Sequence, residues 1–223
     1  MRALIFDLDG TLVDTVYAHV LAWQRTLGEA DLHIEAWRIH RFIGMSGGLL
    51  TRAAAHAAGR AIDDELTERL QARHGAIYKQ LLPDRRPLPG AVALLRHLHD
   101  ARIRYGIATS GKRGDVRPSL EALDVPDDIA IVDRDDVQRA KPEPDLFLAC
   151  QERLHVAREE CYVVGDSVWD LLAARRAGML GVGVLSGGYG EPELTSAGAY
   201  RVYRDPQALL ESFHELGLRA DAG

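Results

Sequence analysis

Short apolar runs alternate with helical patterns along most of the chain. Each run is apolar on both faces of a strand and is bounded by turn residues, which is typical of strands buried inside a parallel sheet. The runs predicted as strands are Ala3–Phe6, Tyr105–Ala108, Ala130–Val132, Tyr162–Val164 and Val182–Leu185. Their alternation with helices predicts an α/β fold with a doubly wound, Rossmann-like parallel sheet.

Segments with helical spacing lie between and after these strands. In one of them Val92, Leu95 and Leu98 fall on the same face. Pro144 stands at the start of a second segment and Gly178 at the end of a third, where these residue types favour helix termini. The helices predicted in this part of the chain are Ala91–Ala101, Leu146–Leu154, Val168–Ala177 and Pro206–Leu218.

Residues 16–88 break the alternation because they contain helical patterns and no convincing strand. The helices predicted there are Val16–Glu29, Trp37–Phe42, Leu49–Ala58 and Asp64–Leu82. A loop, Gly44–Gly48, interrupts them. We therefore predict two domains, a Rossmann-like core made of residues 1–15 and 89–223 and an all-helical insertion made of residues 16–88.

Charge and hydropathy narrow the classes of partner. The chain carries 27 Lys and Arg residues against 33 Asp and Glu residues, a formal net charge of −6. Nucleic acids and anionic membranes need clustered basic residues, so we expect neither as a partner. No run approaches the ~20 apolar residues of a membrane span, and Ala3–Phe6 is too short for a signal peptide. We expect a cytoplasmic protein, and nothing in the sequence requires more than a monomer.

Cys150 and Cys161 are the two cysteines of the chain. Neither belongs to a Cys-x-x-Cys pair, so the sequence indicates neither a zinc site nor a redox motif. A single disulfide could join them, but two reduced thiols are the favoured interpretation for a cytoplasmic protein.

Polar groups follow four of the predicted strands, at the edge where ligands bind in open α/β sheets. Because the carboxyl ends of parallel strands meet at this edge, the groups should converge there. In chain order they are Asp7-Leu8-Asp9-Gly10-Thr11, Thr109-Ser110-Gly111, Lys141-Pro142 and Gly165-Asp166-Ser167-Val168-Trp169-Asp170. The predicted rim therefore combines carboxylates, a hydroxyl with adjacent backbone N–H groups, and a lysine.

Such a rim suits phosphoryl transfer. A phosphate dianion needs a metal ion and a cation to neutralise its charge, and it needs donors for its oxygens. The four rim aspartates would repel one another unless a cation lay among them. All-oxygen ligands favour a hard ion, and Mg²⁺ is the usual partner of carboxylates and phosphate. Lys141 would face the phosphate from the other side, while Thr109 and the N–H of Ser110 would donate hydrogen bonds.

These four motifs, in this order and spacing, resemble those of the haloacid dehalogenase-like hydrolase superfamily. Its Asp-x-Asp-Gly-Thr/Val motif is matched by Asp7–Thr11 and its strand-ending Ser/Thr by Thr109. Its lysine is matched by Lys141, and its Gly-Asp-x-x-x-Asp motif by Gly165–Asp170. The helical insertion resembles the small α-helical cap of the subgroup that includes phosphoglycolate phosphatases and β-phosphoglucomutase. The resemblance spans nearly the whole chain.

The resemblance implies a Mg²⁺-dependent phosphatase that acts on a small phosphorylated metabolite, of the sugar phosphate or phosphoglycolate type, through an aspartyl phosphate. Asp7 would be the nucleophile, and Asp9 would protonate the leaving oxygen and then activate water. The carboxylates of Asp7 and Asp166 and the backbone carbonyl of Asp9 would hold the metal. Asp170 would lie outside the ring of direct ligands, or it would contact the metal through a water molecule.

In such proteins the cap selects the substrate, and a cap loop contacts the leaving group. Met45 and Ser46, in the glycine-rich loop, are therefore candidate substrate contacts. His19 is interpreted first as a helix-packing or hinge residue, and second as a residue that faces the site. Arg41 belongs either to a solvated basic face, the commoner case, or to an anion-binding contact.

A phosphosugar mutase is the first alternative function. The run Asp14–Trp23, which includes His19, resembles β-phosphoglucomutase. Two departures oppose this alternative, because the mutase has an acidic residue where this chain has Gly165 and a cap-loop arginine where it has Gly47. Without a second phosphate anchor in the cap, this chain should lose its product to water.

A non-catalytic phosphate-binding module is the second alternative. Such a protein would be expected to have lost Asp7, Asp9 or Lys141, and all three are present. Dehalogenases and phosphonate hydrolases resemble the same fold but lack the second aspartate. The sequence does not specify which phosphate ester is the substrate.

Overall fold

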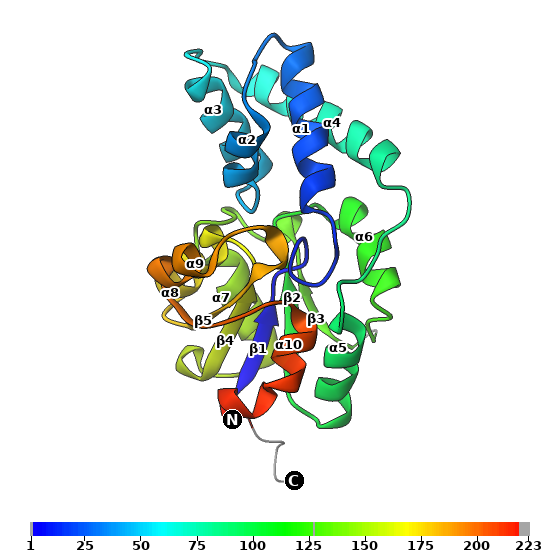
Figure 1. Cartoon of the computed structure of the whole chain (residues 1–223), viewed down its shortest axis with the longest axis vertical. Helices are drawn as coiled ribbons and strands as arrows, with labels where there is room; N and C mark the ends of the chain where they lie inside the picture. Colours follow the sequence, from blue (N-terminus) through cyan, green and yellow to red (C-terminus); the bar gives the residue numbers. More distant parts are fainter. Residues whose placement is uncertain (1, 127, 219–223) are drawn as a thin grey trace.

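Six parallel strands form one sheet in the order β3-β2-β1-β4-β5-β6 within residues 2–126 and 128–218, which the computed structural model describes. The strands are β1 (Ala3–Phe6), β2 (Tyr105–Ala108), β3 (Ala130–Val132), β4 (Cys161–Gly165), β5 (Leu180–Val184) and β6 (Ala199–Tyr203). The first strand lies in the middle of the sheet, and the chain builds outward from it in both directions (Figure 1). This topology confirms the predicted doubly wound fold.

The order of strands reverses beside β1, which pairs with β2 on one side and β4 on the other. Phe6, the last residue of β1, lies opposite Ile107 and Val164. The loops that follow these strands therefore leave the sheet at the same edge and diverge to opposite faces. In doubly wound sheets this divergence opens the crevice that holds the ligand.

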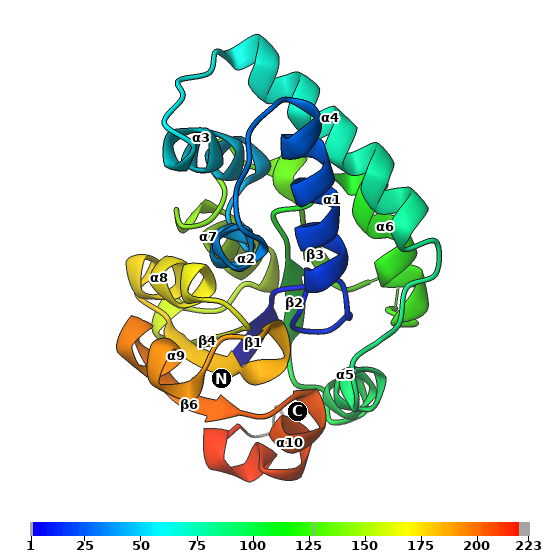
Figure 2. The same ribbon diagram turned by 45° about the horizontal axis from the view of Figure 1, so that its top comes forward.

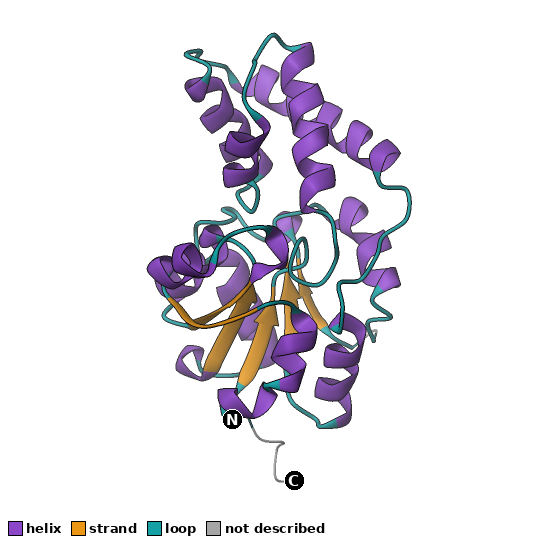
Figure 3. Ribbon diagram, viewed as in Figure 1, coloured by secondary structure: helices purple, strands orange, loops and turns teal. Residues whose placement is uncertain are grey.

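Helices cover both faces of the sheet (Figure 3). They are α5 (Ala91–Asp100), α6 (Arg113–Ala122), α7 (Asp145–Leu154), α8 (Val168–Ala177), α9 (Glu191–Ala197) and α10 (Pro206–Glu211). Short 3₁₀ turns are η1 (Arg134–Asp136), η2 (Arg158–Glu160), η3 (Leu185–Gly187) and η4 (Phe213–Leu216). No helix among the described residues is long and apolar enough to cross a membrane.

Alternate residues of β1 point into two separate hydrophobic cores, which explains why the whole strand is apolar. Leu4 and Phe6 pack with residues of α5 and α10 on one face. Ala3 and Ile5 pack on the other face, where Phe147 of α7 is fully buried.

Four helices lie beyond the carboxyl ends of the strands (Figures 1 and 2). They are α1 (Val16–Glu29), α2 (Ala36–Phe42), α3 (Gly47–Ala57) and α4 (Asp64–Leu81). They share a hydrophobic core of their own, which includes Trp23, Ile39 and Leu70. Residues 16–88 are all described and contain no strand, as the sequence indicated.

Several elements differ from the sequence-based prediction. Strand β6 and helices α6 and α9 were not predicted, and β5 ends at Val184 rather than at Leu185. Strand β6 is at the sheet edge, where exposed residues such as Tyr200 interrupt the apolar run. Helix α6 has Pro118 in its interior and few apolar residues. The last predicted helix, 206–218, ends at Glu211 and continues as a separate 3₁₀ turn.

Cys150 and Cys161 are buried and not bonded to each other. Burial raises the pKa of Cys150 to about 12 and that of Cys161 to about 11. Both groups are therefore protonated thiols at neutral pH, and the absence of a bond between them agrees with the prediction of two reduced cysteines.

Gly90, where the chain enters α5, provides a test of this packing. Its φ is 76°, and a Cβ atom there would lie 2.4 Å from the backbone Cα of Gln207. Gly59 has a similar φ of 73°, but no atom lies within 4 Å of its Cβ position. We expect Gly59→Ala to lower the free energy of unfolding by about 1–2 kcal/mol from left-handed strain alone. Gly90→Ala should lose about 1–3 kcal/mol more from the backbone clash.

Urea unfolding of the two alanine variants measures this difference. Equal losses for Gly59→Ala and Gly90→Ala would show that α10 does not pack against the start of α5 as described.

Candidate active site

Three buried aspartates meet at the carboxyl edge of the sheet. Asp7 follows β1, Asp166 follows β4, and Asp170 lies in the first turn of α8. One carboxylate oxygen from each lies within 4.8 Å of the other two. Their exposed fractions are 4%, 3% and 0%, so the group is almost fully buried, with Asp7 at the edge of the cleft. These three groups therefore converge as the strand positions predicted.

Lys141 enters this cluster from the loop that precedes α7. Its Nζ donates to Oδ1 of Asp170 at 2.8 Å and to Oδ1 of Asp7. Burial disfavours the ammonium, but the charges of Asp170 and Asp7 outweigh that effect and raise the pKa of Lys141. The lysine is therefore a permanent cation inside the acidic cluster.

One lysine does not neutralise three carboxylates. Burial raises the pKa of Asp7 to about 7, with Lys141 opposing the shift and Asp170 adding to it. Burial and the charges of Asp170 and Asp7 raise the pKa of Asp166 well above its usual value. Both shifts come first from burial, and the neighbouring carboxylates add to them. An all-oxygen donor set of this kind fits a hard divalent cation.

The hydrogen bonds of each carboxylate differ. Asp166 accepts from Thr11 Oγ1 at 2.9 Å. Asp170 accepts from the Ser167 N–H at 3.0 Å and from Ser167 Oγ at 2.6 Å, in addition to Lys141. A carboxylate has about four acceptor positions, so Asp170 has less capacity left for a metal than Asp166.

Two glycines allow the chain to approach Asp166 closely. Gly10 has a φ of 83°, and a Cβ there would lie 2.6 Å from Oδ2 of Asp166. A Cβ on Gly187, in the loop after β5, would lie 1.7 Å from the same oxygen. Any larger residue at either position would displace the carboxylate.

Asp9 lies apart from this cluster. Its carboxylate accepts from Thr15 Oγ1 at 2.7 Å and lies 3.7 Å from Nε2 of His19. Burial works against ionisation, but the contacts with His19 and Thr15 lower the pKa of Asp9. The sequence-based expectation that four carboxylates crowd one spot is therefore wrong for the Asp9 side chain.

Two hydroxyl groups follow β2. Thr109 is buried, and its Oγ1 accepts from the Gly111 N–H at 3.1 Å, which leaves its own proton free to donate. Ser110 Oγ is buried and has no hydrogen-bond partner among the described residues. Buried polar atoms without partners are rare, so this arrangement fits an incoming anion.

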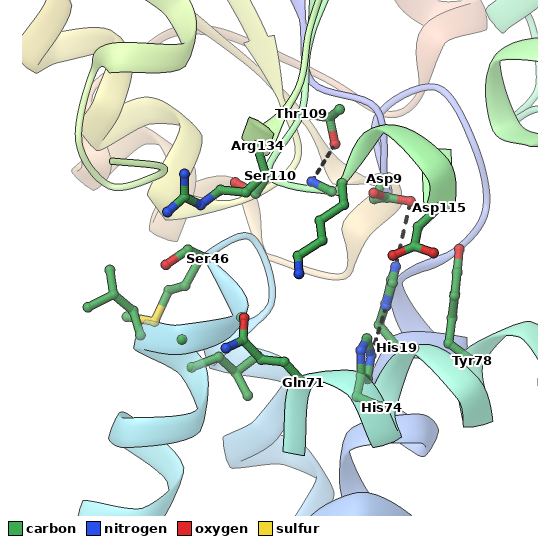
Figure 4. Close-up of a pocket in the computed structure, with 18 of the residues that line it drawn as sticks. Asp9, His19, Ser46, Gln71, His74, Tyr78, Thr109, Ser110, Asp115 and Arg134 are labelled. Carbon is green, nitrogen blue, oxygen red and sulfur yellow. Dashed lines mark hydrogen bonds and ion pairs between the residues drawn. The ribbon is translucent and has the colours of Figure 1, made fainter. Parts of the chain in front are cut away.

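A cleft of about 1210 Å³ lies between these groups and the helices of residues 16–88, which are drawn in the lower part of Figure 4. Asp7, Asp9, Thr109, Ser110 and Lys141 line its sheet side. Predicted contacts from the helices also line it, together with side chains that were not predicted. These residues are His19, Met45, Ser46, Thr67, Gln71, His74 and Tyr78.

Arg41 does not line the cleft. Its guanidinium lies 3.1 Å from a carboxylate oxygen of Glu193, and its backbone carbonyl accepts from Trp169 Nε1 at 2.9 Å and Tyr189 Oη at 3.0 Å. The hypothesis that Arg41 reaches an anionic substrate is therefore not supported. The residue ties α2 to the sheet domain instead.

The comparisons with known proteins agree with this geometry. The profile of a family described as haloacid dehalogenase-like hydrolase matches residues 4–184. The chain belongs to this family. The helices between β1 and α5 fall within the matched region.

Three relatives of this hydrolase cover almost its whole length. A phosphoglycolate phosphatase of Rhodospirillum rubrum is 37% identical over 92% of the chain and 87% of the relative. A β-phosphoglucomutase of Bacillus subtilis is 33% identical over 96% of the chain and 95% of the relative. The crystal structure of a hydrolase from Pseudomonas syringae is 47% identical, with a TM-score of 0.93, over 96% of the chain and 99% of that structure.

Divalent cation should stabilise the protein through the acidic cluster. After removal of metal with a chelator, Mg²⁺ at about 100 times its Kd should add about 2.7 kcal/mol to the free energy of unfolding. For a chain of this size we expect a rise in Tm of about 5–10 °C. Asp166→Asn should abolish most of that rise.

Thermal unfolding with and without Mg²⁺ measures the effect. Asp100→Asn, which removes the same charge at an exposed position on α5, is the matched control and should respond like the unmodified protein. An equal Mg²⁺ response in Asp166→Asn would place the cation elsewhere.

Proposed function

We propose that this hydrolase is a Mg²⁺-dependent phosphatase that acts on a small phosphate monoester, of the sugar phosphate or phosphoglycolate type. One observation carries the proposal. Asp7, the residue in nucleophile position, lies at the base of the cleft beside Lys141 and within 4.8 Å of Asp166. The phosphatase relative and the mutase relative both support a small phosphorylated substrate.

Asp7 is proposed as the nucleophile. Its carboxylate attacks phosphorus, the bond from phosphorus to the ester oxygen breaks, and the electron pair stays on that oxygen, which takes a proton from Asp9. Water, deprotonated by Asp9, then attacks the aspartyl phosphate. That step releases inorganic phosphate and restores the carboxylate of Asp7.

The position of Asp9 supports its acid–base role. It borders the cleft, and its side chain is 24% exposed, so it can reach a substrate without leaving its contacts. Its lowered pKa keeps it ionised in the free protein. The approach of a phosphate dianion raises the proton affinity of a nearby carboxylate and favours the acid form.

The transferred phosphate would bind between Lys141 and the loop after β2. Thr109 Oγ1 and Ser110 are proposed as donors to its oxygens. The Thr109 hydroxyl has a proton free to donate, and Ser110 Oγ has no hydrogen-bond partner among the described residues. Asp7, Asp166 and the carbonyl of Asp9 would hold Mg²⁺, which neutralises charge on the phosphate when bound. Asp170 would mainly hold Lys141 in place.

Residues 16–88 are proposed to act as a cap domain on a core of residues 1–15 and 89–223. The cap side of the cleft includes Met45 and Ser46, which would contact the leaving group. Closure over the substrate would exclude bulk water during the transfer. Every proposed site residue comes from one chain, so we propose that the monomer is active.

The cap provides a poor anchor for the second phosphate that a mutase must hold. Among the described residues that line the cleft, residues 16–88 contribute two permanently charged basic side chains, Arg52 and Lys79. Arg52 lies 2.6 Å from Asp64, and Lys79 lies 2.7 Å from Asp115. Each carboxylate would repel a second phosphate, which favours hydrolysis over isomerisation.

The two glycines that distinguish this chain from the mutase leave little room for larger residues. A Cβ on Gly165 would lie 2.3 Å from Cβ of Asp170. A Cβ on Gly47 would lie 2.9 Å from Oε1 of Gln71. An acidic residue at the first position or an arginine at the second would require these side chains to move.

Phosphate release from a panel of phosphomonoesters tests the proposed activity. With Mg²⁺ the protein should release inorganic phosphate from at least one sugar phosphate or from phosphoglycolate. Asp7→Asn should lower kcat/KM by about 1000-fold or more, because the nucleophile is lost. Asp100→Asn should leave it unchanged, and the absence of release from every ester would reject the proposal.

Product analysis with glucose 1-phosphate distinguishes hydrolysis from isomerisation. We expect glucose and inorganic phosphate in equal amounts, because no second phosphate anchor retains the sugar. Coupled enzymatic detection of glucose 6-phosphate alongside phosphate release measures both outcomes. Formation of glucose 6-phosphate faster than phosphate release would favour the mutase.

A further inference from the structure

Four aromatic rings from two helices interleave above Asp9. Helix α1 contributes His19 and Trp23, and helix α4 contributes His74 and Tyr78, each pair four residues apart. The ring centroids of Tyr78 and His19 are 3.9 Å apart, those of His19 and His74 are 5.1 Å apart, and those of His74 and Trp23 are 4.1 Å apart. The three interplanar angles are 8°, 21° and 12°. Tyr78 stacks on the face of His19 and Trp23 on the face of His74, which fixes the planes of both imidazoles.

The two histidines contact each other, and His19 contacts Asp9, through the nitrogen atoms at the edges of their rings (Figure 4). Nδ1 of His19 lies 3.1 Å from Nε2 of His74, which is hydrogen-bond distance. Nε2 of His19, on the opposite edge, lies 3.7 Å from Oδ1 of Asp9. With its face against Tyr78 and one edge bonded to His74, the His19 ring has one nitrogen left to face Asp9.

His74 is suited to serve as the fixed partner in this arrangement. Burial lowers the pKa of His74 well below its usual value, and a charge on His19 would lower it further, with Asp9 opposing. A neutral imidazole carries one N–H and one bare nitrogen. With its proton on Nε2, His74 donates to Nδ1 of His19, and a neutral His19 then presents its own Nε2–H to Asp9.

We propose that His74 is a positioning residue for the reaction: by bonding Nδ1 of His19 it holds the Nε2 edge of that ring against Asp9. Oδ1 of Asp9 accepts from Thr15 Oγ1 at 2.7 Å and faces Nε2 of His19 at 3.7 Å, so both residues contact the same carboxylate oxygen. The proposal rests on the proposed function of Asp9 as the acid that protonates the leaving oxygen. His74 acts only through His19.

The proposal has a kinetic signature that packing alone does not. Proton donation matters most when the leaving oxygen is basic, as in an unsubstituted phenyl phosphate, and least for p-nitrophenyl phosphate. Substituted phenyl phosphates vary the basicity of the leaving group with little change in size. A misaligned acid should therefore steepen the dependence of kcat/KM on leaving-group pKa, since kcat/KM reports the transfer to Asp7.

His74→Ala and His74→Gln form the central comparison, with Asp9→Asn as the reference for complete loss of the acid. General acid catalysis contributes about 100- to 10,000-fold, so His74→Ala should lower kcat/KM for phenyl phosphate by about 10- to 100-fold. For p-nitrophenyl phosphate the loss should stay below about 3-fold. His74→Gln, whose amide can donate or accept, should recover most of the difference.

His33→Ala is the matched control, because His33 is exposed in the loop between α1 and α2. It should keep the wild-type dependence on leaving group. Circular dichroism establishes that each variant is folded.

The ¹⁵N chemical shifts of the imidazoles in the unmodified protein provide a test that needs no variant. They should show a neutral His74 with one fixed tautomer, and a His74 that averages between tautomers like a free imidazole would overturn the proposal.

The outcomes separate this inference from the proposed function. If Asp9→Asn steepens the dependence and His74→Ala does not, the positioning role of His74 is rejected and the acid role of Asp9 stands. Equal losses in His74→Ala for both esters would reduce His74 to a packing residue and also reject the inference. If Asp9→Asn keeps the wild-type dependence, the acid role itself fails.

Discussion

The burial of three carboxylates around one lysine ammonium is the constraint on which the site depends. Removing charges from water costs several kcal/mol per ion, and only close pairing and hydrogen bonding offset that cost. Lys141 bonds Asp7 and Asp170, while Thr11 bonds Asp166. The sheet makes this possible because β1 and β4 are neighbours, so their carboxyl ends deliver the aspartates to one place.

The same constraint explains why the cluster is suited to a ligand rather than to stability alone. Its three carboxylates exceed its one cation, and burial, with the neighbouring carboxylates adding to it, raises the pKa values of Asp7 and Asp166. A divalent cation would offset this charge, and the proposed phosphate would then lie between that cation and Lys141. The Asp9 side chain lies outside the cluster, where it contacts Thr15 and His19 and borders the cleft, and this position suits the proposed acid–base role.

The sequence predicted what depends on local pattern and missed what depends on tertiary contact. Asp7 and Asp166 were predictable because each directly follows a strand that its apolar run identifies. Strand β6 lies at the sheet edge, where exposed residues interrupt the apolar run that would have predicted a strand. The pairing of His74 with His19 spans 55 positions and depends on how α4 packs on α1. Its one sequence signal is the matching four-residue spacing of aromatic rings on both helices.

The contacts of Arg41 show how the helices above the cleft are coupled to the acidic cluster. The Arg41 carbonyl accepts from Trp169, the residue immediately before Asp170. His40, its neighbour, donates from Nε2 to the carbonyl of Gly187 at 2.7 Å, and Gly187 packs directly against Asp166. Helix α2 is thus bonded to the backbone segments that position two of the carboxylates. A shift of α2 that broke these bonds would loosen both segments, so the placement of the helices and the geometry of the cluster are not independent.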